Sequence, residues 1–284
     1  MVFPRIITAF VLAPLILITV WFGTLPFFLL VLGISLLGVW EYCLMAEEGG
    51  YPNQLILSII GVVAILSALF IDGVPRGPLK TAPNTILILV FWAFIVFFRE
   101  VIRKDDDYSM LRAITTITGV VLIAFFMGHL LLIRDMRFVE GGGFRLAGRE
   151  LVFFLIFVVW GVDTGAWFVG KSWGRIPLAP RISPKKTWEG AIGGTVVGCL
   201  VGWLSREIFL RYGLSVFEAL LFSLIIAVTA QVSDLIESLM KRSFGMKDSS
   251  QLLPGHGGIL DRFDGYIFAA PFYYYLLLGT GRFF

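Results

Sequence analysis

The stretch ELVFFLIFVVWGVDTGAWFVGK, residues 150–171, decides the fold class of this chain. A helix that spans a bilayer needs about 20 largely apolar residues, and this stretch meets that length. Asp163 interrupts it about two helical turns before Lys171, below the surface of the expected membrane. An ionisable side chain within a span costs several kcal/mol, so it marks either a functional site or a buried pair. The stretch therefore predicts a membrane helix with an unusual polar group, and both explanations of Asp163 stay open.

The rest of the chain has the same apolar character. Hydrophobic residues make up 58% and charged residues 15% of the 284 residues, whereas soluble domains are about 45–50% apolar and about 25% charged. We predict an all-α, polytopic integral membrane protein with about nine transmembrane helices. The net charge of +3 fits positive cytoplasmic loops and an anionic ligand, and it does not indicate a nucleic acid partner. The expected spans are residues 6–22, 25–45, 53–71, 84–101, 113–133, 150–170, 187–205, 215–236 and 265–280.

The expected helices divide by role within one integral membrane unit. Residues 1–145 are expected to form the lipid-facing scaffold, and residues 146–284 to carry the catalytic helices. Lys and Arg are more numerous in the loops on the N-terminal side than in the opposite loops, which places the N-terminus in the cytoplasm. The run from Ile6 to Phe22 is expected to be a retained helix, because it is long for a signal peptide and no cleavage site ends it.

Polar residues gather at one end of each of the last four spans. Because consecutive spans run in opposite directions, these four ends fall on the same membrane face, the predicted cytoplasmic one. Five carboxylates from three of these helices would repel one another unless cations held them together, and oxygen ligands without Cys suggest Mg²⁺. These five are Asp163, Asp234, Glu237, Asp261 and Asp264. The groups are Asp163 and Lys171, then Lys185, Lys186 and Glu189, then Asp234, Glu237 and Lys241, and finally Asp261 and Asp264.

Other residues of this half are typical of phosphate binding. In RISPKKTWEG, residues 181–190, Ser183 is expected to cap a helix and Pro184 to take its first position. Lys185 and Lys186 would then stand beside the free amides of a helix N-terminus, which is a natural anion site. The glycines of PGHGG, residues 254–258, allow backbone amides to approach a ligand closely.

Three of these assignments have a simpler alternative. Lys185 and Lys186 would also serve as topological anchors at the membrane surface. His256 in a glycine-rich turn would also be structural. Glu41, near the cytoplasmic end of the second expected span, either supports the site or has no role in it.

The segment SLMKRSFGMKDSSQLLPGHGGILDRFD, residues 238–264, resembles the signature of the phosphatidate cytidylyltransferases (CDP-diacylglycerol synthases). That pattern reads S-x-x-K-R-x-x-x-x-K-D and, after a short spacer, P-x-H-G-G-x-x-D-R-x-D, and every fixed position matches. The stretches DTGAWFVGKSWG (163–174) and SPKKTWEG (183–190) are also similar to the family. The resemblance is dense over residues 160–270 and only architectural before them.

The resemblance implies an enzyme that joins CTP and phosphatidate to give CDP-diacylglycerol and pyrophosphate, with Mg²⁺ and a possible second, monovalent cation. It implies an inner membrane protein whose site faces the cytoplasm, and a possible homodimer. It further implies roles for individual residues. The expected metal ligands are Asp261 and Asp264, with Asp234, Asp248 and Asp163 as further candidates. The expected catalytic residues are Asp261, Asp264, Lys247 and Arg262. The expected substrate-binding residues are Lys185, Lys186, Lys241, Arg242, Ser238, His256, Gly257 and Gly258.

Other classes of membrane protein also bury charges. A secondary transporter of an anionic substrate would place them near the midplane, in paired broken helices of two related halves. A CDP-alcohol phosphotransferase would also handle cytidine nucleotides, but its D-G-x-x-A-R pattern does not appear around Asp264. A polytopic scaffold without chemistry is the remaining alternative. The signature favours the cytidylyltransferase.

Overall fold

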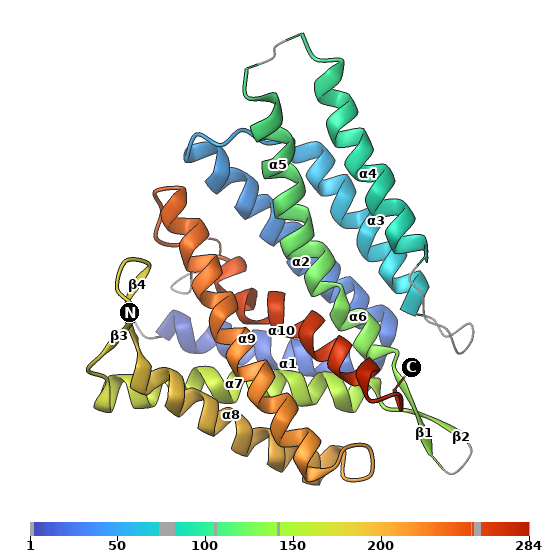
Figure 1. The fold of residues 1–284 in the computed structure, drawn as a ribbon, viewed down its shortest axis with the longest axis vertical. Coiled ribbons are helices and arrows are strands. Elements are labelled where there is room, and N and C mark those ends of the chain that lie inside the picture. Colours follow the sequence, from blue (N-terminus) through green and yellow to red (C-terminus); the bar gives the residue numbers. More distant parts are fainter. Residues whose placement is uncertain are drawn as a thin grey trace. The chain divides into compact units, whose positions relative to one another are not determined.

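The computed structural model describes residues 3–73, 83–104, 107–140, 143–250, 252 and 257–283, most of them helical (Figure 1). The chain divides into two compact units. Unit 1 comprises Met1–Leu132 and Met240–Phe263, and unit 2 comprises Ile133–Leu239 and Asp264–Phe284. The expected division by role, after residue 145, stays a prediction; the compact units divide earlier, and residues 240–263 belong with the N-terminal helices.

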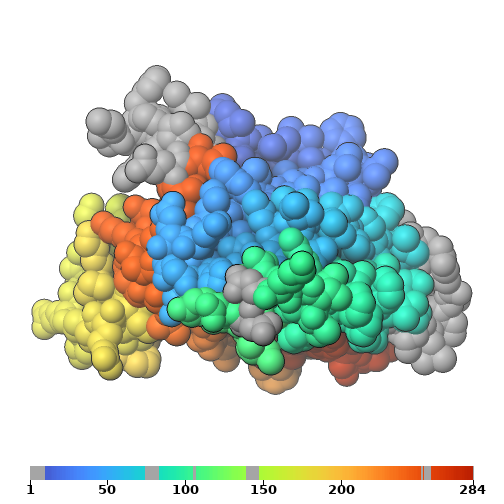
Figure 2. Space-filling view, turned by 90° about the horizontal axis from the view of Figure 1, so that it is seen from above, coloured from blue at the N-terminus to red at the C-terminus, as the bar shows by residue number. Residues whose placement is uncertain are grey.

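Unit 1 is a bundle of helices in which α2, α3, α4 and α5 pack against one another. Figure 2 shows the side chains of α3, α4 and α5, cyan to green, lying together on one face. The outer side chains of α4 are mostly exposed and apolar, as expected of a helix that faces lipid. The elements are α1 (Phe3–Phe22), α2 (Thr24–Glu48), α3 (Leu55–Gly73), α4 (Pro83–Val101), α5 (Ser109–Val120), a π-helical turn (Val121–Phe125) and the beginning of α6 (His129–Arg134).

A buried polar network joins the ends of three helices in unit 1. Arg112 donates from Nε to Glu100 Oε2 at 3.0 Å, and both side chains are less than a tenth exposed. Gln54 donates from Nε2 to Glu100 Oε1 at 2.6 Å, and its backbone N–H donates to Thr116 Oγ1 at 2.9 Å. These charges are therefore compensated by partners within the bundle.

Unit 2 is built on the antiparallel pair α7 and α8, which lie side by side in Figure 1. Small residues allow the two backbones to approach closely: a Cβ on Gly194 of α8 would lie 2.7 Å from the carbonyl oxygen of Val162 on α7. A β-hairpin lies at each end of this pair. The elements are β1 (Arg137–Glu140), β2 (Gly143–Leu146), α7 (Gly148–Trp173), β3 (Pro177–Ala179), β4 (Ser183–Thr187), α8 (Trp188–Phe209), and most of α9 (Val216–Ser243) and α10 (Leu260–Gly279).

The helical, polytopic fold class is confirmed, whereas the count of nine spans stays a prediction. Among the described residues, seven helices are long and apolar enough to cross a membrane. The first expected span contributes a shorter apolar segment, Phe10–Phe22. The last expected span is not among the seven, because the first turns of α10 hold Asp261, Arg262 and Asp264 and three tyrosines follow at 273–275. The two short hairpins were not predicted.

Candidate functional site

A cavity of about 520 Å³ in unit 2 brings together five of the polar residues singled out in the sequence. Asp163 and Lys171 reach it from α7, Lys185 and Lys186 from β4, and Asp234 from α9. Lys186 forms an ion pair with Asp234. Residues far apart in the sequence therefore line one space that combines acidic and basic groups. The remaining lining residues are Ala166, Trp167, Gly170, Leu178, Ser183, Thr187, Gly190, Ala191 and Gln231.

The segment that carries the two lysines is a strand and not the start of a helix, so the expected cap at Ser183 is wrong. Ser183 pairs with Ala179 across the β3–β4 hairpin. Helix α8 begins later, and Thr187 caps it by accepting a hydrogen bond from the N–H of Gly190 at 3.2 Å. Thr187 is also a favourable capping residue, and the hairpin holds Ser183 in an extended conformation. Lys185 and Lys186 consequently precede the helix N-terminus instead of standing within its first turn.

An acidic cluster lies beside the cavity in unit 2 and shares Asp234 with it. Each of Asp234, Glu237 and Asp264 offers a carboxylate oxygen within 4.8 Å of the others. At 4 Å and an effective dielectric constant of about 20, two like charges repel by about 4 kcal/mol. Ser233 of α9 donates to the backbone oxygen of Asp264, which joins the first turns of α10 to α9. The N–H of Gly265 donates to Asp264 Oδ1 at 2.7 Å. Three hard oxygen ligands held this close fit a divalent cation such as Mg²⁺.

Glu237 is the member of this cluster that was missing from the predicted ligands. It is buried, with 1% of its surface exposed. Its spacing of three from Asp234 on a helix was a sufficient signal, because residues three apart lie on the same helix face. The family signature begins at Ser238, one residue after Glu237, so the resemblance implied no role for Glu237.

Asp261 has a different environment, in unit 1. Its Oδ1 accepts from the ammonium of Lys241. Its Oδ2 accepts from the backbone N–H of Ser249 at 3.0 Å, from the hydroxyl of Ser249 at 2.8 Å and from the N–H of Gly258 at 2.8 Å. Both oxygens are therefore engaged by groups of the signature segment, residues 238–264. The role of Asp261 as a metal ligand stays a prediction.

Glu41 of α2 is completely buried and reaches the same segment. Its carboxylate accepts from the hydroxyls of Ser249 at 3.1 Å and Ser250 at 2.5 Å. It also accepts from the backbone N–H groups of Ile259 and Leu260, each at 2.9 Å. The sequence left a supporting role for Glu41 open; the structure gives it four hydrogen bonds to the signature segment.

The remaining predicted residues lie along this segment. Gly257 has φ +82°, a left-handed conformation that favours glycine, and a Cβ there would lie 2.8 Å from Asp261 Oδ2. Arg242 donates to the backbone oxygen of Met246 at 2.8 Å. Ser238 is buried on α9. His256 lies outside the described residues. The exposed members are Arg242, Lys247, Asp248 and Arg262.

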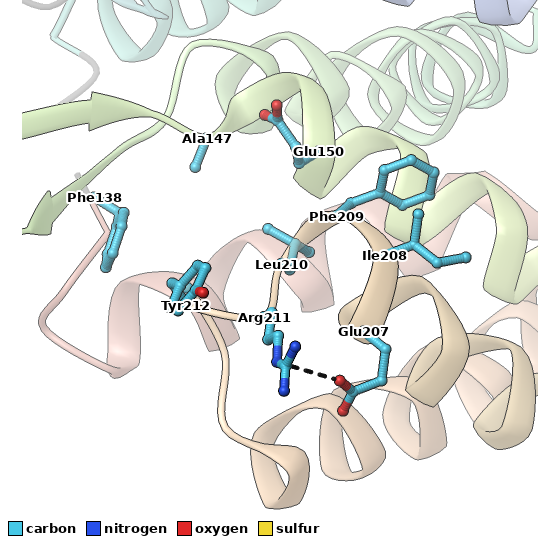
Figure 3. Close-up of a pocket in the computed structure, with 10 residues that line it drawn as sticks. Phe138, Ala147, Glu150, Glu207, Ile208, Phe209, Leu210, Arg211 and Tyr212 are labelled. Atoms are coloured by element: carbon cyan, nitrogen blue, oxygen red, sulfur yellow. Dashed lines mark ion pairs between the residues drawn. The ribbon is translucent and has the colours of Figure 1, made fainter.

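A second cavity, of about 320 Å³, lies at the other end of α7 and α8 (Figure 3). Glu150, Glu207 and Arg211 line it together with Phe138 and Tyr212. Figure 3 shows Arg211 turned toward Glu207, and their ion pair measures 3.7 Å. None of the predicted site residues lines this cavity. The cavity that contains Asp163 is therefore the better candidate for the functional site.

Comparison with known proteins agrees with the chemistry of that cavity. A family model described as "Cytidylyltransferase family" matches residues 3–279. The chain is similar to the phosphatidate cytidylyltransferase of Pseudomonas aeruginosa, with 32% identity over 98% of this chain and 97% of the relative. It is 31% identical to the phosphatidate cytidylyltransferase of Bacillus subtilis, over 81% of this chain and 90% of the relative. The enzyme of the same name from Staphylococcus aureus is 37% identical over 67% of this chain and 68% of the relative.

Proposed function

This chain belongs to the cytidylyltransferase family, and we propose that it transfers CMP from CTP to phosphatidate, giving CDP-diacylglycerol and pyrophosphate. The names of its relatives support this choice of substrates. The observation that carries it is the position of Asp234, which belongs both to the acidic cluster and to the cavity lined by three lysines. Carboxylates for a metal beside cations for phosphate are the recurring requirement of nucleotide chemistry.

The proposed reaction needs no general base. The second pKa of a phosphate monoester is about 6, so phosphatidate is mostly a dianion at neutral pH. One of its oxygens attacks the α-phosphorus of CTP and forms the new P–O bond. The bond from the α-phosphorus to the bridging oxygen breaks, and pyrophosphate leaves with the electron pair. What the protein must supply is relief from the repulsion between two anions, together with alignment of the reacting groups.

The lysines of the cavity supply part of that relief. Lys171, Lys185 and Lys186 line the space in which a triphosphate would lie. Lys186 pairs with Asp234, so it lies at the boundary between the basic and the acidic walls. We assign phosphate binding to Lys185 and Lys186 first. Lys241, Arg242, Lys247 and Arg262 stay candidates for the phosphates of CTP or of the leaving pyrophosphate.

Mg²⁺ is the proposed cofactor, and the family and the acidic cluster together support a divalent cation. Asp234, Glu237 and Asp264 would hold it, with Asp163 lining the adjacent cavity. When bound, the ion would neutralise charge on the phosphate oxygens. Asp248 and Asp261 stay further candidates, as does a second, monovalent cation.

The chain is an integral membrane protein by its apolar helices. We propose that it lies in the plasma membrane, with its N-terminus and its site at the cytoplasmic face. The excess of Lys and Arg on that side supports this orientation, and CTP is a water-soluble substrate that must reach the site from an aqueous compartment. Assembly as a homodimer stays a prediction.

A single assay tests the proposal. Purified protein is mixed with cytidine-labelled CTP, phosphatidate and Mg²⁺, and the organic phase is examined for a labelled lipid while pyrophosphate is measured in the aqueous phase. We expect equal amounts of both products, and neither without phosphatidate. A transporter or a scaffold would give neither product. A CDP-alcohol phosphotransferase would give no pyrophosphate.

A further inference from the structure

Glu41 joins the N-terminal helices to the signature segment by four hydrogen bonds. It lies on α2, more than 200 residues before its partners, and none of its surface is exposed. Its four hydrogen bonds go to two separate parts of the segment, Ser249 and Ser250 on one side and Ile259 and Leu260 on the other. A single carboxylate therefore holds together the two flanks of residues 251–258.

The physical basis is the N-terminus of α10. The first N–H groups of a helix have no partner within the helix, and the helix dipole places partial positive charge there. Glu41 accepts two of these N–H groups, from Ile259 and Leu260. A buried carboxylate would be unfavourable without such compensation. The side chain thus replaces a local cap with one from a distant helix.

The packing around this carboxylate leaves no room for a side chain on Gly258. A Cβ there would lie 2.5 Å and 2.7 Å from the two carboxylate oxygens of Glu41. The same glycine donates its N–H to Asp261 Oδ2, and Ser249 donates to both Glu41 and Asp261. Asp261 in turn pairs with Lys241 of α9. The hydroxyl of Ser249 therefore links the two carboxylates in one continuous network.

We propose that Glu41 is a positioning residue for the reaction, by which α2 fixes the signature segment and the cations that it carries. Lys247 lies two residues before Ser249, and Arg262 lies two residues after Leu260. Each cation is therefore close in sequence to a residue that donates a hydrogen bond to Glu41. The proposal rests on the proposed function and deepens it. It gives the N-terminal half of the chain a specific part in CTP binding.

The test is Glu41→Gln, with Glu48→Gln as the matched control, because Glu48 is exposed on the same helix. The amide keeps the size of the side chain, but only its oxygen can accept. Each carboxylate oxygen of Glu41 accepts one hydrogen bond from each flank, so the change removes one hydrogen bond at both flanks. We expect the KM for CTP to rise about tenfold, the amount expected for lost hydrogen bonds to a charged group, with a smaller fall in kcat. Glu48→Gln should leave both constants unchanged.

A measurement without substrates separates this inference from the proposed function. Lys247 is exposed, so tryptic cleavage after Lys247 in the purified protein reports on how firmly the segment is held. Cleavage there should be several-fold faster in Glu41→Gln than in Glu48→Gln. An unchanged cleavage rate together with an unchanged KM for CTP would overturn the inference. Absence of CMP transfer in the wild-type protein would instead overturn the proposed function.

A milder variant keeps the inference testable if Glu41→Gln does not fold. Ser250→Ala removes one of the two hydroxyl donors to Glu41. We expect the KM for CTP to rise a few-fold. Where Glu41→Gln does fold, the double variant should raise the KM by less than the product of the two single effects, because Ser250 acts through its hydrogen bond to Glu41. Fully multiplicative effects in the double variant would contradict the shared role.

Discussion

Two groups of charged residues in this protein differ in the sign of the charges that they bring together. In unit 1, Glu100 has its partners Arg112 and Gln54 within hydrogen-bond distance. In unit 2, three carboxylates lie within 4.8 Å of one another. In the first arrangement the opposite charges and the donors compensate each other, so removing one partner would leave a buried charge uncompensated. The second holds like charges together beside one lysine, Lys186, and a divalent cation would relieve the repulsion among the three carboxylates. The sign of the neighbouring charges therefore distinguishes a structural ion pair from a candidate metal site.

The strongest test of this contrast is Asp264→Asn in the acidic cluster. The change removes one negative charge and one anionic ligand, so the protein should stay folded and inserted while CMP transfer falls by about a thousandfold or more. That magnitude follows from the several kcal/mol that a bound metal ion supplies to phosphoryl chemistry. The measurement is the initial rate of labelled lipid formation over a series of Mg²⁺ concentrations, with thermal unfolding measured in parallel.

Asp107→Asn is the matched control, since Asp107 is exposed in unit 1 and far in sequence from the site. It should keep the wild-type rate at every Mg²⁺ concentration. A fully active Asp264→Asn protein would contradict the assignment of the acidic cluster to the metal.

The opposite result is expected for Glu100→Gln in unit 1. Arg112 would lose its anionic partner while remaining buried, and breaking a buried pair in this way costs about 3–5 kcal/mol. The midpoint of thermal unfolding in detergent should fall by several degrees, whereas CMP transfer per folded molecule should not change. Glu47→Gln, at an exposed position of α2, is the control. A loss of specific activity at unchanged stability would show that this network is not merely structural.

Lys186→Gln tests the contact between the lysines of the cavity and the acidic cluster in unit 2. Lys186 pairs with Asp234 and lines the cavity. We expect kcat/KM for CTP to fall between about tenfold and a hundredfold, as for the loss of one hydrogen bond to a charged group. Lys104→Gln, at an exposed position in unit 1, should have no effect. Steady-state kinetics with CTP as the varied substrate would detect the difference, and equal values for both variants would remove Lys186 from the site.

The smallest expected effect concerns the cap of α8. Thr187→Ala removes the hydroxyl that accepts from Gly190, which costs about 1 kcal/mol. Ser183→Ala leaves that cap in place and should change stability by less than about 0.5 kcal/mol. Thermal unfolding of the two variants side by side distinguishes them. A larger loss in Ser183→Ala would restore the helix start that the sequence suggested.

Predictions from local sequence were correct where a pattern fits only one structure. They failed where two nearby residues could both cap the same helix. The apolar runs predicted the helical, polytopic membrane class because a bilayer accepts few other sequences of that length. The helix start before Lys185 was misplaced because Ser183 and Thr187 are both capping residues, and the β3–β4 pairing decides between them. The last span was expected at residue 265, but α10 begins at Leu260 because Glu41 accepts its first N–H groups.

The sequence by itself determined the membrane class, the family signature and the residue types of the site. Only the tertiary structure decided which carboxylates meet. It grouped Asp264 with Asp234 and Glu237, and it gave Asp261, three residues earlier on the same helix, to Lys241 and Ser249. The reason is that residue spacing fixes the face of a helix, whereas the neighbour that a face meets depends on packing between helices distant in the sequence.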